Sequence, residues 1–310
     1  MMRQARVTYP LFALGAVAVV FACGGTTPAP ADPTDAGQDG TAPTSTATGV
    51  VTVPTDGSIG CGKSGVTPGF TQGLKLTVTS RARTYAVGVP DTYEATKAYP
   101  LVFVFHGDGG TGAQIRSSIK LEEASGGNAI VVYPDGLNKT WNLDSAPTDN
   151  PDADLFDAIV TSISETHCVD KKRIFVTGFS RGGYFANQLA CWKGDVIRAA
   201  ASNGSGGPYG AAGAKYDAKG NLACPTPGVP TIIFHGQNDS PTEGQKTLDH
   251  FARANECPDK TKTTAVAPSP CASVDGCAAG KPVVWCLVPG LGHTIWPESH
   301  KATWDFFSKL

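Results

Sequence analysis

The sequence contains no run of basic residues and no apolar segment long enough to cross a membrane. Its 310 residues carry a formal net charge of −2. Proteins that bind nucleic acid need concentrated positive charge to hold phosphates, so we expect no nucleic-acid partner. The cysteines and histidines do not follow the spacing of a zinc site, and we expect neither a metal nor a cofactor.

The first 58 residues predict export rather than a folded domain. A positively charged start leads into an apolar run that is too short to span a bilayer, which indicates a signal peptide over residues 1–22. Cys23 follows in a lipobox-like setting, so we expect it to be lipidated; the alternative is an ordinary signal peptide cut nearby. Residues 23–58 contain almost no large apolar side chains and predict a disordered tether. We therefore expect an extracytoplasmic protein that meets the membrane only through its lipid.

Eight cysteines remain when Cys23 is set aside. An even number in an exported domain predicts four disulfides, although the sequence leaves the pairing open. Candidate pairs are Cys271 with Cys277, Cys257 with Cys286, and Cys191 with Cys224. The eight residues are Cys61, Cys168, Cys191, Cys224, Cys257, Cys271, Cys277 and Cys286.

Residues 59–310 predict one α/β domain with a mostly parallel central sheet. Continuous apolar runs at 101–105 and 231–234 are typical of strands buried on both faces. Helical patterns alternate with the strands, so we expect helices on both faces, and no long insertion indicates a large lid. The expected strands are 74–79, 83–89, 101–105, 129–133, 173–177, 199–201, 231–234 and 283–288, and the expected helices include 111–124, 152–166, 184–190 and 298–310.

The sequence Gly178-Phe179-Ser180-Arg181-Gly182 lies between an expected strand and an expected helix. A strand, a G-x-S-x-G turn and a helix form a nucleophile elbow, in which a strained turn exposes a serine hydroxyl. The two glycines relieve the crowding that this turn creates. The alternative is a glycine-rich turn with an idle serine, in a chain of 37 glycines. We predict Ser180 as a catalytic nucleophile.

A catalytic triad on this fold follows the order serine, acid, histidine. Asp239 comes a few residues after the expected strand 231–234, where an acid would fix the tautomer of the histidine. The alternative for Asp239 is a turn or helix-capping residue. Among the histidines that follow it, only His293 lies in a glycine-rich loop after a strand, so His293 is the predicted base.

The loop His106-Gly107-Asp108-Gly109-Gly110 follows the expected strand 101–105. In an α/β hydrolase, this loop supplies one backbone N–H of the oxyanion hole, and the residue after the nucleophile supplies the other. We assign these donors to Asp108, with Gly107 as the second choice, and to Arg181. A glycine-rich strand-to-helix turn without a binding role is the alternative.

Several other residues have weaker indications of a role. Trp141 lies in a polar loop at the expected carboxyl edge of the sheet, where it would either line the substrate cleft or cap the core. Glu243 and Asp249 fall in the helix after Asp239 and are expected to point to solvent. His106 and His235 each precede a glycine at a strand end, where we expect a structural hydrogen bond.

These motifs resemble those of secreted esterases related to feruloyl esterases and poly(3-hydroxybutyrate) depolymerases, of carbohydrate esterase family one. The resemblance implies an α/β hydrolase with the triad Ser180, Asp239 and His293. Trp296 is the second aromatic candidate for substrate binding, although two residues separate it from His293 where the family usually has one. The matching segments are Gly60–Lys63, Arg83–Tyr85, Val89-Pro90, His106-Gly107, Tyr133–Gly136, Trp141, Asp152, Phe156–Ala158, Gly178–Ser180, His235-Gly236, Asp239, Trp285-Cys286, Gly292-His293 and Trp296-Pro297.

We therefore expect a monomeric serine carboxylic-ester hydrolase that takes an ester-bearing polymer or its oligomers. The first expectation is a feruloyl esterase that acts on plant cell-wall polysaccharide. The alternatives within enzymes are a polyhydroxybutyrate-type depolymerase and an acetylxylan esterase. The alternative from another class is a catalytically dead hydrolase fold that serves as a surface binding protein.

Overall fold

The computed structural model describes residues 54–310 of the chain. The predicted signal peptide, Cys23 and the predicted tether up to residue 53 lie outside this part. Ser58, which the prediction placed in the tether, is buried; its hydroxyl donates to the His167 carbonyl (2.7 Å) and accepts from the Val169 N–H (3.1 Å). The packed domain therefore begins before residue 59. Within residues 54–310, no helix has the length and apolar character needed to cross a bilayer.

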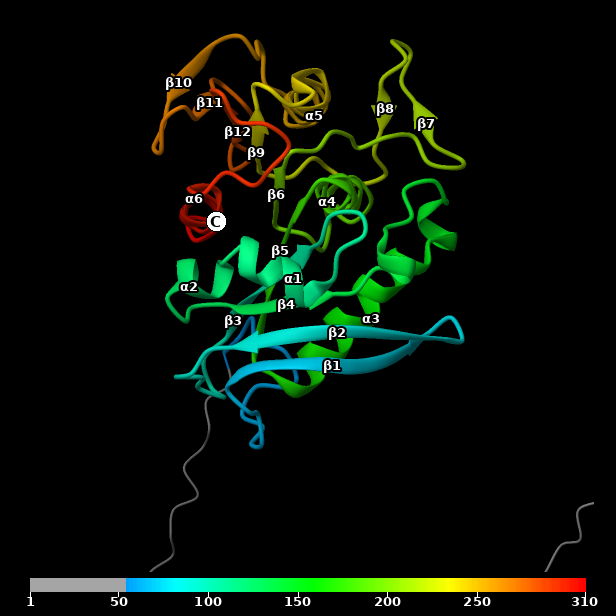
Figure 1. Cartoon of the computed structure of the whole chain (residues 1–310), viewed down its shortest axis with the longest axis vertical. Helices are drawn as coiled ribbons and strands as arrows, with labels where there is room; N and C mark the ends of the chain where they lie inside the picture. The colour runs from blue at the N-terminus through cyan, green and yellow to red at the C-terminus, as the bar shows by residue number, and fades with distance from the viewer. Residues whose placement is uncertain (1–53) are drawn as a thin grey trace, which may run out of the picture. The chain divides into compact units, whose positions relative to one another are not determined.

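A ten-stranded sheet forms the centre of the domain (Figure 1). Its strands are β1 (Gly69–Val78), β2 (Arg81–Val89), β3 (Tyr99–Phe105), β4 (Ile130–Pro134), β5 (Val169–Phe179), β6 (Ala199–Asn203), β9 (Thr231–Gly236), β10 (Thr263–Ala265), β11 (Ala272–Val274) and β12 (Val283–Val288). Their order is β1-β2-β4-β3-β5-β6-β9-β12-β11-β10. The six central strands run parallel, and they are β4, β3, β5, β6, β9 and β12. At one edge β1 and β2, and at the other β10 and β11, pair antiparallel with their neighbours.

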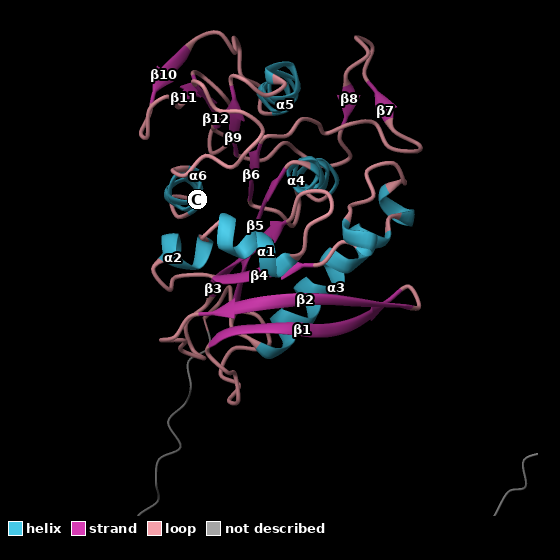
Figure 2. Ribbon diagram, viewed as in Figure 1, coloured by secondary structure: helices cyan, strands magenta, loops and turns pink. Residues whose placement is uncertain are grey.

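Helices cover both faces of the sheet (Figure 2). They are α1 (Gly112–Ser118), α2 (Leu121–Ser125), α3 (Pro151–Thr166), α4 (Arg181–Trp192), α5 (Pro241–Ala254) and α6 (Ser299–Phe307). One core joins the sheet to α3, α4 and α5, and the other joins it to α1, α2 and α6. This arrangement confirms the predicted α/β class with its mostly parallel sheet.

The middle strand β3 shows why these segments read as unbroken apolar runs. Leu101, Phe103 and Phe105 point into the core with α3 and α4, whereas Val102 and Val104 point into the core with α1 and α6. Successive side chains of a strand face opposite sides of the sheet, so a sheet covered on both faces needs apolar residues at every position. Burial on both faces also fixes the position of the strand ends, from which the site is built.

Besides earlier starts of β1 at Gly69 and β5 at Val169, where the expected strands begin at 74 and 173, the structure differs from the expected elements in three places. The expected helix 111–124 is two helices, because the buried Ile119 leaves the helical conformation (φ −108°, ψ 87°) between α1 and α2. The short strands β10 and β11 extend the sheet, and β7 (Lys215–Tyr216) pairs with β8 (Leu222–Ala223) in the long loop after β6. Strands of two or three residues carry too little alternation for a sequence pattern to reveal them.

The eight cysteines form four disulfides, as predicted. The pairs are Cys61–Cys168, Cys191–Cys224, Cys257–Cys277 and Cys271–Cys286. The candidate pairs Cys271–Cys277 and Cys257–Cys286 were wrong, because strand register decides the partner of Cys271. Ala272 of β11 lies opposite Trp285 of the antiparallel β12, which places Cys271 beside Cys286.

His250 of α5 is a buried titratable group next to one of these disulfides. Its Nε2 lies 3.2 Å from the Cys224 Sγ. Burial lowers the pKa of His250 to about 4, from an ordinary value of 6.5. The unfolded chain therefore binds a proton in a pH range in which the folded chain does not. The stability that neutral His250 contributes is present in full above pH 6.5 and is lost as the pH falls toward 4.

We predict that His250→Gln weakens the dependence of stability on acid. The free energy of unfolding of the wild type should fall by about 3 kcal/mol through this group alone between neutral pH and about pH 4. Urea unfolding of wild type and variant at a series of pH values measures the difference in slope. Parallel curves for the two proteins would contradict the assignment.

Candidate active site

Ser180 occupies a sharp turn between β5 and α4. Its backbone has φ 52° and ψ −125°, a strained conformation that residues other than glycine rarely adopt. A Cβ at Gly178 would collide with the carbonyl of Gly182, and a Cβ at Gly182 would collide with the carbonyls of Phe105 and His106. The turn is therefore possible only with glycine at both positions, which gives the G-x-S-x-G pattern a steric cause.

The structure brings Ser180, His293 and Asp239 into one chain of hydrogen bonds. The Ser180 Oγ lies 2.9 Å from the His293 Nε2, and the His293 Nδ1 lies 2.8 Å from the Asp239 Oδ2. The three residues follow β5, β12 and β9, whose carboxyl ends lie at the same edge of the sheet. The arrangement leaves the Nε2 lone pair facing the serine hydroxyl, since Nδ1 carries the proton that Asp239 accepts.

Asp239 is ionised at neutral pH. Its burial opposes the charge, but hydrogen bonds from His293 and the Ser240 backbone outweigh this effect and hold the pKa of Asp239 below its ordinary value. A second histidine, His235, lies with its Nε2 3.5 Å from the same carboxylate oxygen, Oδ2. Burial lowers the pKa of His235, so its ring is neutral there. The sequence predicts a structural hydrogen bond for His235, and this prediction was wrong, because neither of its buried ring nitrogens has a hydrogen-bond partner within residues 54–310.

The loop after β3 lies directly against the elbow. A Cβ at Gly107 would be 3.4 Å from the Ser180 Cβ, so the backbone passes beside the nucleophile. The N–H groups of Gly109 and Gly110 donate to the carbonyls of Lys139 and Gly107. Because these two N–H groups already donate within the protein, the backbone N–H groups of Gly107 and Asp108 are the candidates in this loop for donation to an oxyanion.

His106 anchors this loop through both ring nitrogens. The Gly136 N–H donates to the His106 Nε2 (2.9 Å), so the proton is on Nδ1, which lies 2.8 Å from the Gly107 carbonyl. Burial lowers the pKa of His106 and keeps the ring neutral, as this pattern requires. These contacts are the structural hydrogen bonds that the sequence predicts for His106.

Trp141 does not line a cleft, so of the two roles that the sequence leaves open for it, the substrate-binding one was wrong. Its side chain is fully buried, stacks on Phe185 and donates from Nε1 to the His106 carbonyl at 2.8 Å. Its own carbonyl accepts from the Arg181 Nε at 2.8 Å. Trp141 therefore caps the core and ties the loop after β3 to the start of α4. An indole ring among apolar neighbours needs one polar partner, and the His106 carbonyl supplies it.

Trp296, the other aromatic candidate, is half-buried. Its ring centroid lies 6.0 Å from that of Phe234, and the side chain packs against the core that contains α6. A different aromatic ring approaches the base: the Phe179 ring centroid lies 5.0 Å from that of His293. Phe179 directly precedes the nucleophile in the G-x-S-x-G sequence, so its place in the elbow accounts for this contact.

Glu243 does not point to solvent, in contrast to the expectation for the first turn of α5. One carboxylate oxygen, Oε2, accepts a hydrogen bond from the Tyr209 hydroxyl and lies 3.4 Å from the Tyr184 hydroxyl. Neither tyrosine is predicted from the sequence. Tyr184 stands one helical turn after Ser180, a spacing that could have indicated it, whereas Tyr209 lies in a glycine-rich loop without any periodic signal.

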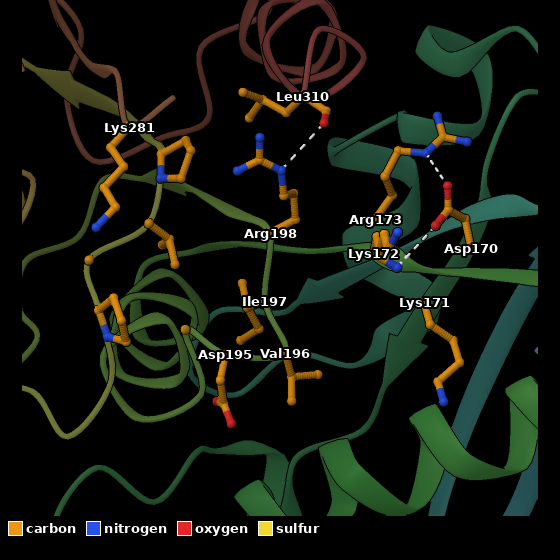
Figure 3. Close-up of a pocket in the computed structure, with 15 residues that line it drawn as sticks. Asp170, Lys171, Lys172, Arg173, Asp195, Val196, Ile197, Arg198, Lys281 and Leu310 are labelled. Atoms are coloured by element: carbon orange, nitrogen blue, oxygen red, sulfur yellow. Dashed lines mark hydrogen bonds and ion pairs between the residues drawn. The ribbon is translucent and has the colours of Figure 1, made fainter. Parts of the chain in front are cut away.

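Figure 3 shows a cavity, of about 630 Å³, whose lining includes none of the triad residues. Basic side chains at the amino ends of the parallel strands line it, including Lys172, Arg198 and Lys281. Arg198 donates from Nε to the carbonyl of Leu310 at 3.3 Å. Ligands of open α/β sheets bind outside the carboxyl ends of the strands, so this cavity is at the wrong edge for the reaction.

Within residues 54–310, one group of side chains has the spacing of metal ligands: Cys191, Cys224 and His250. Cys191 and Cys224 are joined in a disulfide, so neither offers a thiolate. The group therefore does not fit a metal ion while the disulfide is intact.

Comparison with known proteins decides which esterases this chain belongs with. No protein-family model matches the chain. Feruloyl esterase D of Neurospora crassa is 30% identical to it over 284 residues, which cover 82% of this chain and 90% of that protein. Feruloyl esterase C of Emericella nidulans is 32% identical over 268 residues, with 81% and 90% covered. The chain belongs to the feruloyl esterase family.

Solved structures agree with this feruloyl esterase fold. An acetyl xylan esterase from Aspergillus awamori superposes with a TM-score of 0.60 and 17% identity, over 78% of this chain and 99% of that one. A feruloyl esterase module from Clostridium thermocellum gives a TM-score of 0.53 and 11% identity, over 84% and 92%. The chain is thus an α/β hydrolase of the serine carboxylic-ester hydrolase class, as predicted.

We predict that Gly182→Ala lowers esterase activity by about a hundredfold or more, because a shift of the elbow by an ångström misplaces the nucleophile. The added methyl group collides with the carbonyls of Phe105 and His106 at the end of β3, so a drop in melting temperature should accompany the loss. Gly292→Ala is the matched control, since nothing lies within 4 Å of its added Cβ. Initial rates on an aryl acetate and thermal melts measure both effects. Near wild-type activity in Gly182→Ala would contradict the steric account.

Proposed function

We propose that this protein is a feruloyl esterase that releases hydroxycinnamic acids from esters on plant cell-wall polysaccharide. The observation that carries the proposal is the hydrogen-bonded chain from Ser180 through His293 to Asp239 in a member of this family. Such a chain performs acyl transfer through a covalent intermediate. No step requires a metal or a redox group.

In the first half of the reaction, His293 removes the proton from the Ser180 hydroxyl as its oxygen attacks the ester carbonyl. Asp239 stays ionised and stabilises the imidazolium that forms. The C–O bond to the alcohol then breaks, and the imidazolium gives its proton to the leaving oxygen. In the second half, His293 takes a proton from water as the water oxygen attacks the acyl carbonyl. The bond from the acyl carbon to the Ser180 Oγ then breaks, the imidazolium returns the proton to that oxygen, and the acid leaves.

The negative charge on the carbonyl oxygen needs donors that are in place before the reaction. We assign them to the backbone N–H groups of Asp108 and Arg181. Arg181 is the first residue of α4, where a backbone N–H has no partner within the helix, and the positive end of the helix dipole adds to the field. Loss of one such donor typically raises the barrier by about 2.7–4 kcal/mol.

We further propose that the enzyme is exported and held at the cell envelope as a monomer through a lipid on Cys23. Four disulfides are typical of proteins that fold in an oxidising compartment. The residues between Cys23 and the packed domain would then serve as a spacer that lets the catalytic edge reach a polymer.

We predict that Ser180→Ala abolishes ferulate release from methyl ferulate, with a loss of at least about 10⁴-fold in kcat. His293→Ala should lose about as much, because the serine and the histidine act as a unit. Chromatography of released ferulic acid measures the rates, and thermal melts check that the variants are folded. Ferulate release that survives in Ser180→Ala would exclude the proposed nucleophile.

The same assay separates the competing substrate classes. A hydroxybutyrate oligomer and acetylated xylan are tested beside methyl ferulate. If the wild type hydrolyses the hydroxybutyrate oligomer or the acetylated xylan but leaves methyl ferulate intact, the substrate assignment is wrong although the mechanism stands.

A further inference from the structure

A cluster of Tyr184, Tyr209 and Glu243 borders the triad and has no part in the proposed chemistry. Tyr184 follows Ser180 by one helical turn, and its N–H donates to the Ser180 carbonyl at 3.0 Å. Glu243 follows Asp239 by four residues and lies in the first turn of α5. Each therefore lies four residues beyond a triad residue, on the same edge of the sheet.

A short glycine-rich strip connects the cluster to the acid–base pair. A Cβ at Gly204 would lie 3.5 Å from both the Asp239 Oδ2 and the His293 Nδ1. Two residues further on, a Cβ at Gly206 would lie 2.8–3.0 Å from atoms of all three cluster residues. The backbone therefore lies against the triad at Gly204 and against the cluster at Gly206, with the buried Ser205 between these two positions.

The hydrogen bonds of the cluster hold its aromatic rings in fixed positions. The rings of Tyr184 and Tyr209 stack at 28° with centroids 5.5 Å apart, and their hydroxyls meet at the Glu243 Oε2. Lys246 donates from Nζ to the other oxygen, Oε1, at 2.6 Å. Tyr209 is nonetheless 37% exposed, so a ring whose hydroxyl is anchored still presents its surface to solvent.

The protonation states of Glu243 and the two tyrosines suit a surface that binds hydroxyl groups. Burial opposes the charge on Glu243, but hydrogen bonds from Lys246 and Tyr209 outweigh it and hold the pKa of Glu243 below its ordinary value. Burial raises the pKa of both tyrosine hydroxyls, which therefore stay protonated. At neutral pH the cluster offers neutral aromatic faces beside a carboxylate, which is a strong acceptor for hydroxyl groups.

The position of the cluster indicates which part of an ester it would meet. The loop that faces the carbonyl oxygen follows β3, which lies on one side of β5, whereas Tyr209 and Glu243 follow β6 and β9 on the other side. His293, which donates a proton to the departing alcohol, lies on the side of the cluster. A leaving alcohol would thus extend toward Tyr209, away from the oxyanion donors.

We propose that Tyr184, Tyr209 and Glu243 form a subsite for the sugar that carries the ester, on the leaving-alcohol side of Ser180. The apolar C–H face of the sugar ring packs on Tyr209, and its hydroxyls donate to Glu243. Because the hydrogen bonds already fix the tyrosine ring, binding costs little side-chain entropy. This inference rests on the proposed feruloyl esterase activity and specifies the alcohol half of its substrate.

The test compares two ferulate esters that differ only in the alcohol. Methyl ferulate lacks a sugar, and a feruloylated arabinoxylan oligosaccharide carries one. The measured quantity is kcat/KM for the oligosaccharide divided by kcat/KM for methyl ferulate. In Tyr209→Ala this ratio should fall about tenfold or more, mainly because KM for the oligosaccharide rises. A tenfold change corresponds to about 1.4 kcal/mol of binding free energy. Tyr209→Phe keeps the ring and should lose less, and Glu243→Gln should lower the ratio without removing a ring.

Val196→Ala is the control. Val196 is an exposed apolar residue that lines the cavity away from the triad, and the ratio for Val196→Ala should equal that of the wild type. An equal loss on both esters, or a ratio that does not change in any of the three cluster variants, would overturn the subsite. If Tyr209→Ala does not fold, Tyr209→Phe and Glu243→Gln decide the question. A wild type that does not cleave methyl ferulate would instead contradict the proposed function.

Discussion

The strained turn at Ser180 is the constraint on which the rest of the site depends. A positive φ at a serine persists only where the surroundings over-determine it. Here the backbones of the β5–α4 turn and the β3 loop approach too closely for a Cβ at Gly178 or Gly182, and the Ser180 N–H donates to the Asn203 carbonyl at the end of β6. Three neighbouring strands thus hold the nucleophile, and the same close packing places Gly107 beside it.

A buried ion pair supports the loop that faces Ser180. Arg83 donates from Nη2 to the Asp152 Oδ1 at 2.6 Å, and the side chains of both residues are 2% exposed. The other oxygen, Oδ2, accepts from the Asn142 N–H at 2.7 Å. Asn142 adjoins Trp141, which donates to the His106 carbonyl. Removal of Arg83 would leave a buried charge without its partner, so the antiparallel edge of the sheet, though remote from the reaction, helps to fix the site.

The sequence was most informative where local pattern and sheet topology coincide. Apolar runs located the parallel strands, and the order of Ser180, Asp239 and His293 along the chain located three residues that meet at the carboxyl edge. The failures have a common cause, which is packing between distant segments. A buried ring and an exposed ring have the same letters, so Trp141 could not be assigned to the core. The partner of Glu243 lies 34 residues away in an irregular loop, and the partner of Cys271 follows from a strand register that no pattern showed.

The central claim is that Ser180 is a nucleophile activated by His293, and labelling with a serine-directed fluorophosphonate tests it most directly. The account predicts one adduct by intact-mass spectrometry, located on the peptide that contains Ser180, and a much slower labelling rate in His293→Ala. Folded wild-type protein that remains unlabelled, or an adduct on another residue, would contradict the account.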